Sequence, residues 1–478
     1  MVFSAPTFLF VFLPAVLVAT WLAPSRLRRY VILAASAAFY FWGVQEFLFA
    51  VWASTLIDWG IGLGIARARR DGRTGLARAL LIGSLLQNLG LLAYYKYAGF
   101  AADQLDRLST VLDGPSLQVA AIALPIGISF FTFEKISYVV DVWRGDVEAR
   151  RDPIDVLLFV SLFPRSIAGP IVRLREIQDD LRRPTPTLDG VSEGAVRFAY
   201  GLAKKVLIAD QIAAVADASF AAAPAGTLTT SAAWIGALAF SLQLYFDFSG
   251  YSDMAIGIGK MLGFTLPENF RRPYSSVSIT DFWRRWHMTL SRWFRDYLYV
   301  PLGGNRHGSA ATYRNLIIVF TLTGLWHGAA WTFVLWGLYH GAWMLVERRM
   351  GWRDVDGQRP HHLVWRRAVT FLIVLIGWVL FRADSLDVAS SYYHAMFVPT
   401  GGLTPAVHAV LSNQAITVLA LASLILVLPA ARAGGPWLSS AAGRVPAVLR
   451  VAALGAVFPL TLAFTLSNGF SPFLYFQF

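Results

Sequence analysis

The sequence predicts an all-α membrane protein, a transmembrane helical bundle that crosses the bilayer many times. Three observations support this fold class. The chain has 478 residues, of which 56% are hydrophobic and only 15% are charged. Its mean hydropathy is +0.53, and long apolar runs recur along it. Because soluble domains carry about a quarter charged residues, lipid must cover part of this chain.

The apolar runs follow one another without a linker that would separate soluble domains. We therefore expect residues 1–478 to form a single integral-membrane domain with about ten to twelve spans. Several runs are shorter than the roughly 20 residues that a spanning helix needs, so some are expected to be re-entrant or interfacial. The runs are 5–23, 30–44, 46–66, 79–100, 118–140, 193–215, 231–246, 313–333, 334–347, 368–382, 411–430 and 447–467.

Residues 162–177 interrupt an apolar run with Pro164, Gly169 and Pro170. Non-helical backbone at membrane depth must be buried in protein or line a wet cavity. We expect this segment to lie inside the bundle. A short span that ends in a surface turn is the alternative.

The composition excludes several classes of site. The chain contains no cysteine, which rules out disulfides, thiolate metal sites and a cysteine nucleophile. Its net charge of +12 is typical, in a membrane chain, of cytoplasmic loops and anionic lipid rather than of nucleic acid. No Walker loop, dinucleotide fingerprint, G-x-S-x-G elbow or H-E-x-x-H pattern occurs. We therefore expect no resident cofactor, no metal site and no built-in serine hydrolase.

Residues 282–304 combine arginines and tryptophans around His287. Ser278 and Asp281 have the spacing of a capping box, so a helix is expected to begin there. Its aromatic face would carry Trp283, Trp286, Leu290, Trp293 and Tyr297, and its cationic face Arg284, Arg285, Arg292 and Arg295. One interpretation is an interfacial anchor. The other is a cationic entrance for a phosphate-bearing ligand, because guanidinium groups bind phosphates with two donors at once.

A second histidine lies in an uncharged apolar run. Residues 319–343 contain no formally charged residue, and His327 stands in the middle, followed by three small residues. Ionisable groups at membrane depth are functional by default because burying them is costly. A helix-to-helix hydrogen bond is the alternative. On a continuous helix His340 would point about 220° away from His327, so we interpret His340 as structural.

Two acidic residues, Asp247 and Asp253, lie within or beside the apolar sequence "FDFSGYSDMAIG". Either carboxylate could orient a histidine or pair with an arginine. We weigh structural ion pairing equally with a role in chemistry.

Long motifs of the chain resemble the membrane-bound O-acyltransferase family, in its bacterial alginate O-acetyltransferase branch. They are "PENFRRPYSSVSITDFWRRWHMTLSRWFRDYLYVPLGGNR", "LTGLWHGAAWTFVLWGLYHG", "LPIGISFFTFEKISYVVDVWRG", "GWVLFRADSL" and "SPFLYFQF", with a core motif region of about 120–345. One departure is Arg165-Ser166, where a pair such as Gln-Leu is expected. It leaves the lining of that segment open.

This resemblance implies a helical enzyme of the bacterial inner membrane with a central tunnel. The family's two histidines correspond to His287 and His327. The implied activity moves an acetyl group from a cytoplasmic donor, acetyl-CoA or another activated acyl donor, to an extracytoplasmic polysaccharide. An SGNH-type extracytoplasmic acetyltransferase is the implied partner. Arg284, Arg285, Arg292 and Asp253 are the candidate donor-binding residues.

The chemistry agrees with these residues. Acyl transfer needs an activated hydroxyl and stabilisation of an oxyanion. Histidine accepts a hydroxyl proton near neutral pH, so we expect His327 to be the general base and His287 to assist it. Direct transfer is favoured, and a transient acyl-histidine remains open. The alternatives are D-alanyl transfer, peptidoglycan O-acetylation and transport, in which buried histidines would line a permeation path.

The basic loops predict the orientation of the first helices. "PSRLRRY" follows the first apolar run and "ARARRDGR" follows the third, so both should be cytoplasmic and the N-terminus extracytoplasmic. Cysteine labelling tests this without background, because the chain has no cysteine. We expect the cysteine of Arg70→Cys to react with a membrane-impermeant thiol reagent only after the membrane has been permeabilised. Labelling of that position from outside intact cells would contradict the orientation.

Overall fold

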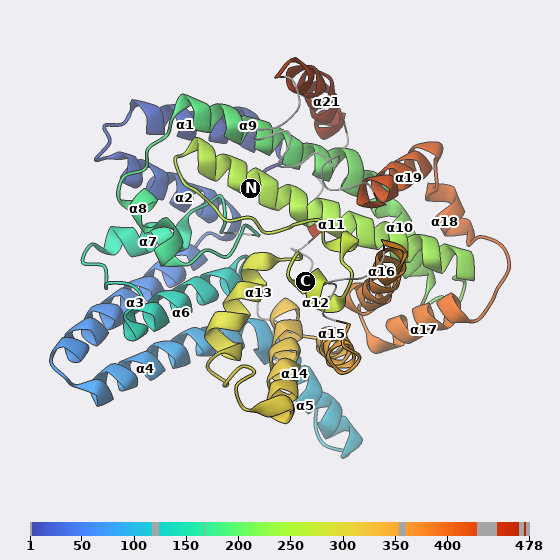
Figure 1. Ribbon diagram of the computed structural model, residues 1–478, viewed down its shortest axis with the longest axis horizontal. Coiled ribbons are helices and arrows are strands. Elements are labelled where there is room, and N and C mark those ends of the chain that lie inside the picture. The colour runs from blue at the N-terminus through green and yellow to red at the C-terminus, as the bar shows by residue number, and fades with distance from the viewer. Residues whose placement is uncertain are drawn as a thin grey trace. The chain divides into compact units, whose positions relative to one another are not determined.

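The computed structural model describes residues 2–116, 124–166, 168–352, 360–427, 447–467 and 473–474. All regular structure in these ranges is helical, as predicted (Figure 1). The chain forms two compact units, Met1–Ala195 with Ala255–Pro267 and Val196–Met254 with Glu268–Phe478. The single domain over residues 1–478 stays a prediction.

The first unit contains the helices of the N-terminal part of the chain, joined mostly by short turns. They are η1 (Phe8–Phe12), α1 (Leu13–Leu22), α2 (Arg28–Val44), α3 (Phe47–Arg70), α4 (Thr74–Leu92), η2 (Ala93–Tyr97), α5 (Ala98–Val111), α6 (Ile128–Arg144), α7 (Pro153–Ser161) and α8 (Leu174–Arg182). Within this unit α3, α4 and α6 pack side by side (Figure 1).

The second unit contains most of the remaining helices. Two long helices, α9 (Leu188–Ala203) and α11 (Thr230–Met261), contribute residues to both units. The others are η3 (Lys204–Ala209), α10 (Asp210–Ala222), η4 (Pro273–Ser275), α12 (Ile279–Trp283), α13 (Met288–Phe294), η5 (Arg295–Tyr299), α14 (Gly308–His327), α15 (Trp331–Arg349), α16 (Pro360–Arg382), α17 (Leu386–Phe397), α18 (Pro405–Val410), α19 (Asn413–Val427) and α21 (Ala447–Ser467).

Three helical stretches in the described ranges are long and apolar enough to cross a membrane: Phe47–Arg70, Thr74–Val111 and His362–Arg382. They contain the whole or nearly the whole of the predicted runs 46–66, 79–100 and 368–382. Shorter apolar helices occur at Phe8–Leu22, Asn413–Leu426 and Gly455–Ser467. The total of ten to twelve spans stays a prediction.

The interrupted segment after α7 is buried, as expected from its prolines and glycine. The described residues from Leu162 to Val172 are irregular in structure and almost inaccessible. Arg165, the residue that departs from the family pattern, forms a fully buried ion pair with Glu134 of α6. Its guanidinium also lies over the ring of Phe159, 4.7 Å from the centroid. The unexpected arginine is therefore matched by a carboxylate within the same unit.

The cationic segment is not the continuous helix that its periodicity predicted. Ser278 does cap a helix, because its hydroxyl accepts a hydrogen bond from the backbone N–H of Asp281 at 3.0 Å. However, α12 ends at Trp283, and α13 begins only at Met288. Between them the backbone of His287 is left-handed, with φ 43° and ψ 53°. Non-glycine residues rarely adopt this conformation, and periodicity gives no signal for it.

The predicted runs 313–333 and 334–347 form a helical hairpin, α14 and α15, whose backbones touch (Figure 1). A Cβ atom on Gly324 would lie 2.2 Å from the carbonyl oxygen of Phe333, and one on Gly337 would lie 2.2 Å from that of Phe320. The chain turns at residues 328–330, so the helix ends at His327. Small residues thus permit this crossing.

Adding one methyl group at this crossing should destabilise the protein. We expect Gly337→Ala to lower the free energy of unfolding by roughly 1–3 kcal/mol, because the new Cβ meets a backbone carbonyl that cannot rotate away. Gly83→Ala is the matched control, since a Cβ there meets nothing within 4 Å. The measurement is thermal unfolding of the detergent-solubilised protein. Equal melting temperatures for the two variants would contradict the described crossing.

Candidate active site

His287 is held in its left-handed turn by Asn269. Its ring Nδ1 lies 3.1 Å from Oδ1 of Asn269, an oxygen that also accepts a hydrogen bond from the Thr289 hydroxyl at 2.9 Å. The backbone N–H of Met288 donates to the carbonyl of Asn269 at 2.9 Å. Because an amide oxygen only accepts, Nδ1 of His287 carries the proton and Nε2 carries the lone pair.

The Nε2 atom of His287 carries a lone pair that no donor among the described residues occupies. The side chain is 0% exposed, and Nε2 has no hydrogen-bond partner in the described part of the chain. Burial lowers the pKa of His287 below its usual range, so the ring is neutral at neutral pH. Asn269 was missed by sequence reasoning, since it lies 18 residues from His287 and only the folded chain brings them together.

His327 is the last residue of α14 and lies in an aromatic cage. Its ring centroid is 4.9 Å from that of Trp326, 5.1 Å from that of Trp336 and 5.1 Å from that of Phe381. The ring of Trp326 also lies 6.1 Å from that of His287. One indole therefore contacts both histidines.

A pocket of about 540 Å³ lies next to these histidines in the second unit. Met288, which follows His287, and Thr323, one turn before His327, both line it. Its wall also includes Trp283, whose ring is 5.6 Å from that of Trp336. The indole of Trp336 thus lies between Trp283 in the pocket wall and His327.

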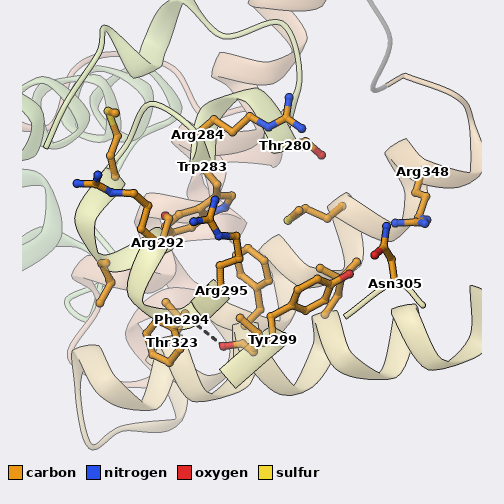
Figure 2. A pocket seen from close by; sticks show the side chains of 17 residues that line it. Thr280, Trp283, Arg284, Arg292, Phe294, Arg295, Tyr299, Asn305, Thr323 and Arg348 are labelled. Atoms are coloured by element: carbon orange, nitrogen blue, oxygen red, sulfur yellow. Dashed lines mark hydrogen bonds between the residues drawn. The ribbon is translucent and has the colours of Figure 1, made fainter. Parts of the chain in front are cut away.

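Four arginines line this pocket and give it a cationic rim: Arg284, Arg292, Arg295 and Arg348 (Figure 2). Arg295 pairs with Asp296, with an Nε–Oδ1 distance of 2.7 Å. Within the described residues, Arg284 and Arg348 form no hydrogen bond or ion pair. None of the described residues that line the pocket is a carboxylate, so this lining is positively charged. Arg348 was not predicted, because it lies on α15, more than fifty residues from the arginines of the cationic segment.

Two predicted donor-binding residues lie elsewhere. Arg285 does not line the pocket, and its Nε donates to Asp281 Oδ1 at 2.8 Å. Asp253 is also absent from the lining and accepts hydrogen bonds from Arg197 at 2.7 Å and Lys204 at 2.6 Å. The structural ion pairing weighed for Asp253 is therefore present. Asp247 pairs in the same way with Lys205 at 2.9 Å.

The predicted orientation of His340 relative to His327 was wrong. It assumed one continuous helix, but α14 ends at His327 and α15 begins at Trp331. The ring of Trp336 lies 5.1 Å from His327 and 5.1 Å from His340. His340 therefore belongs to the same buried aromatic cluster.

Comparison with known proteins assigns the chain to a family. Residues 126–353 match the membrane-bound O-acyltransferase family. A probable alginate O-acetylase AlgI from Azotobacter vinelandii is 43% identical over the full length of both chains. One from Pseudomonas aeruginosa is 47% identical over 89% of this chain and 81% of its own. A peptidoglycan O-acetyltransferase from Helicobacter pylori is 36% identical over 81% of this chain and 78% of its own.

The likeness to the Azotobacter protein extends over the full length of both chains. The chain belongs to the membrane-bound O-acyltransferase family, and it is a membrane acyltransferase that uses an acyl donor.

Proposed function

We propose that this enzyme is a multi-pass protein of the bacterial inner membrane that moves an acetyl group from a cytoplasmic donor across the membrane, for O-acetylation of an alginate-like exopolysaccharide. The observation that carries the proposal is the pair of buried histidines sharing Trp326 beside an arginine-lined pocket. The names of the Azotobacter and Pseudomonas relatives support an acetyl group and a polysaccharide acceptor.

The donor, acetyl-CoA or another phosphate-bearing acyl donor, binds in the pocket. Arg284, Arg292 and Arg348 hold its phosphate groups through charge-assisted hydrogen bonds. The apolar walls, among them Trp283 and Phe320, contact the arm that carries the acyl group. Arg285 keeps the turn after α12 in place through Asp281 rather than touching the donor.

His327 removes the proton from the acceptor hydroxyl while the hydroxyl oxygen attacks the acyl carbon. The leaving group of the donor then takes this proton. His287 assists by positioning the acceptor or passing the proton on, because Asn269 fixes its Nδ1–H and leaves Nε2 available. The acetyl ester formed on this hydroxyl is then the donor for an SGNH-type extracytoplasmic partner, which breaks that ester and completes the transfer to the polysaccharide.

Peptidoglycan O-acetylation is the second candidate function, favoured by the name of the Helicobacter relative. D-alanyl transfer would use the same base and pocket with another acyl group. Analysis of acyl groups on the exopolysaccharide, the peptidoglycan and teichoic acid of cells with and without this gene separates the three. Acetyl lost from the exopolysaccharide alone supports the first function.

Removing a pocket arginine should weaken donor use. We expect Arg284→Gln and Arg348→Gln each to raise the KM for the donor about tenfold, because a hydrogen bond to a charged group contributes about 1.5–3 kcal/mol. Arg285→Gln is the matched control, since it removes the same charge outside the pocket. Initial rates against acetyl-CoA concentration in membrane vesicles measure this. An equal rise in KM for Arg285→Gln would show that the pocket is not the donor site.

Removing the general base should abolish acetylation without affecting folding. We expect His327→Ala to lower the transfer rate by about 10²–10⁴-fold at normal abundance, and His287→Ala to be impaired less. His408→Ala, an exposed histidine on α18, should behave as the parent. The readout is acetyl bound to the exopolysaccharide relative to the enzyme in the membrane. A folded His327→Ala enzyme working at the parental rate would refute the assignment.

A further inference from the structure

One face of α15 carries three buried polar side chains without hydrogen-bond partners. Thr332, Trp336 and His340 are spaced four residues apart, so they lie above one another on one face of the helix. They are 1%, 0% and 0% exposed. The Thr332 hydroxyl, the Trp336 indole nitrogen and both ring nitrogens of His340 form no hydrogen bond in the described part of the chain.

Such a row of unpartnered groups requires an explanation. More than nine in ten buried polar groups in proteins have a partner, because a buried polar group without one destabilises the fold. A threonine inside a helix commonly bonds back to the preceding turn, but the turn before Thr332 is the non-helical connection at Gly328. The pairing of these groups therefore must come from something outside the described protein atoms.

This face of α15 lies next to His327, the proposed general base. The ring of Trp336 meets that of His327 edge to face at 5.1 Å and 89°. The α15 helix begins four residues after His327, and no side chain caps its N-terminus. On its other side Trp336 lies next to Trp283 of the pocket wall.

Acyl transfer forms an oxyanion on the acyl group, and N–H donors stabilise an oxyanion. When the acceptor oxygen bonds to the acyl carbon, the carbonyl π electrons move to its oxygen, and His327 takes the hydroxyl proton. When the lone pair re-forms the C=O bond, the donor's leaving group departs with the bonding electrons and accepts the proton from His327. The oxygen carries negative charge only between these steps, where preorganised N–H donors are most effective.

We propose that the indole N–H of Trp336 donates the hydrogen bond that stabilises this oxyanion, on the unpartnered face formed by Thr332, Trp336 and His340. The assignment rests on the proposed function, because it takes His327 as the base. It adds a residue that stabilises the carbonyl oxygen, a role that the proposed function gives to neither histidine.

A stacked neighbour provides the control. Trp378 is 1% exposed, and its ring stacks on that of Trp336 at 5.7 Å and 21°. Its indole N–H, unlike that of Trp336, donates to the Tyr274 hydroxyl at 2.9 Å. Replacing either tryptophan by phenylalanine removes one N–H and part of one ring from the same cluster. Only the Trp378 change breaks a hydrogen bond within the protein.

The test compares Trp336→Phe with Trp378→Phe in membrane vesicles, with acetyl-CoA as the donor and polysaccharide-bound acetyl as the product. We expect Trp336→Phe to lower kcat about 10²–10³-fold, the usual effect of removing one oxyanion donor, with KM for acetyl-CoA changed by less than about twofold. Trp378→Phe should keep the parental kcat and melt at a lower temperature. A parental kcat for folded Trp336→Phe would overturn the proposal.

If Trp336→Phe does not fold, the benzothienyl analogue of tryptophan at position 336 keeps the bicyclic ring and lacks only the N–H. It should show the same loss of kcat, and a parental kcat would equally overturn the proposal. Two controls, the unmodified enzyme and His327→Ala, separate this inference from the proposed function. If the unmodified enzyme transfers no acetyl, or if His327→Ala remains active, the proposed function fails. If both behave as expected, only the role of Trp336 is tested.

Discussion

The crossing of α14 and α15 is the contact on which the arrangement of the second unit depends. Gly324 and Gly337 let the two backbones touch, and any Cβ at either position would meet a carbonyl oxygen at 2.2 Å. This contact fixes the short turn at residues 328–330, where Gly328 lies against the ring of Phe333. His327 ends one helix at this turn and the face of Trp336 begins on the next. The short distance between the His327 imidazole and the Trp336 indole thus depends on glycine at positions 324 and 337.

Charge is distributed differently around the pocket and in the rest of the protein. Buried charges away from the pocket are matched, as Asp253 is by Arg197 and Lys204, and Arg165 by Glu134. Unmatched buried charge is costly. In the pocket, by contrast, Arg284 is exposed and Arg348 is half-buried, and neither has a carboxylate partner within the described residues. Their guanidinium groups are therefore accessible to an anionic ligand, which is why the pocket is the proposed place for the donor.

The sequence was informative wherever a pattern is local. Composition predicted the helical membrane class, three apolar runs matched helices long enough to span, and Pro164 and Gly169 indicated the buried irregular segment. Ser278 was correctly predicted as a helix cap. The features that could not be predicted depend on contacts between distant residues. The left-handed turn at His287 is held by Asn269, and Arg348 comes to the pocket from another helix. The orientation expected for His340 was wrong because α14 ends at His327 and α15 begins only at Trp331, so the two histidines do not lie on one continuous helix.

The central claim is that the arginine-lined pocket, His327 and Trp336 form one reacting centre. A structure of the enzyme with a non-reactive ketone analogue of acetyl-CoA, in which CH2 replaces the sulfur and the carbonyl is kept, can test it. We expect phosphate oxygens within hydrogen-bond distance of Arg284 and Arg348, and the acyl carbonyl oxygen within about 3 Å of the Trp336 indole nitrogen beside His327. An analogue bound elsewhere, or bound in this pocket with its acyl group directed away from His327, would show that the pocket, His327 and Trp336 do not act together.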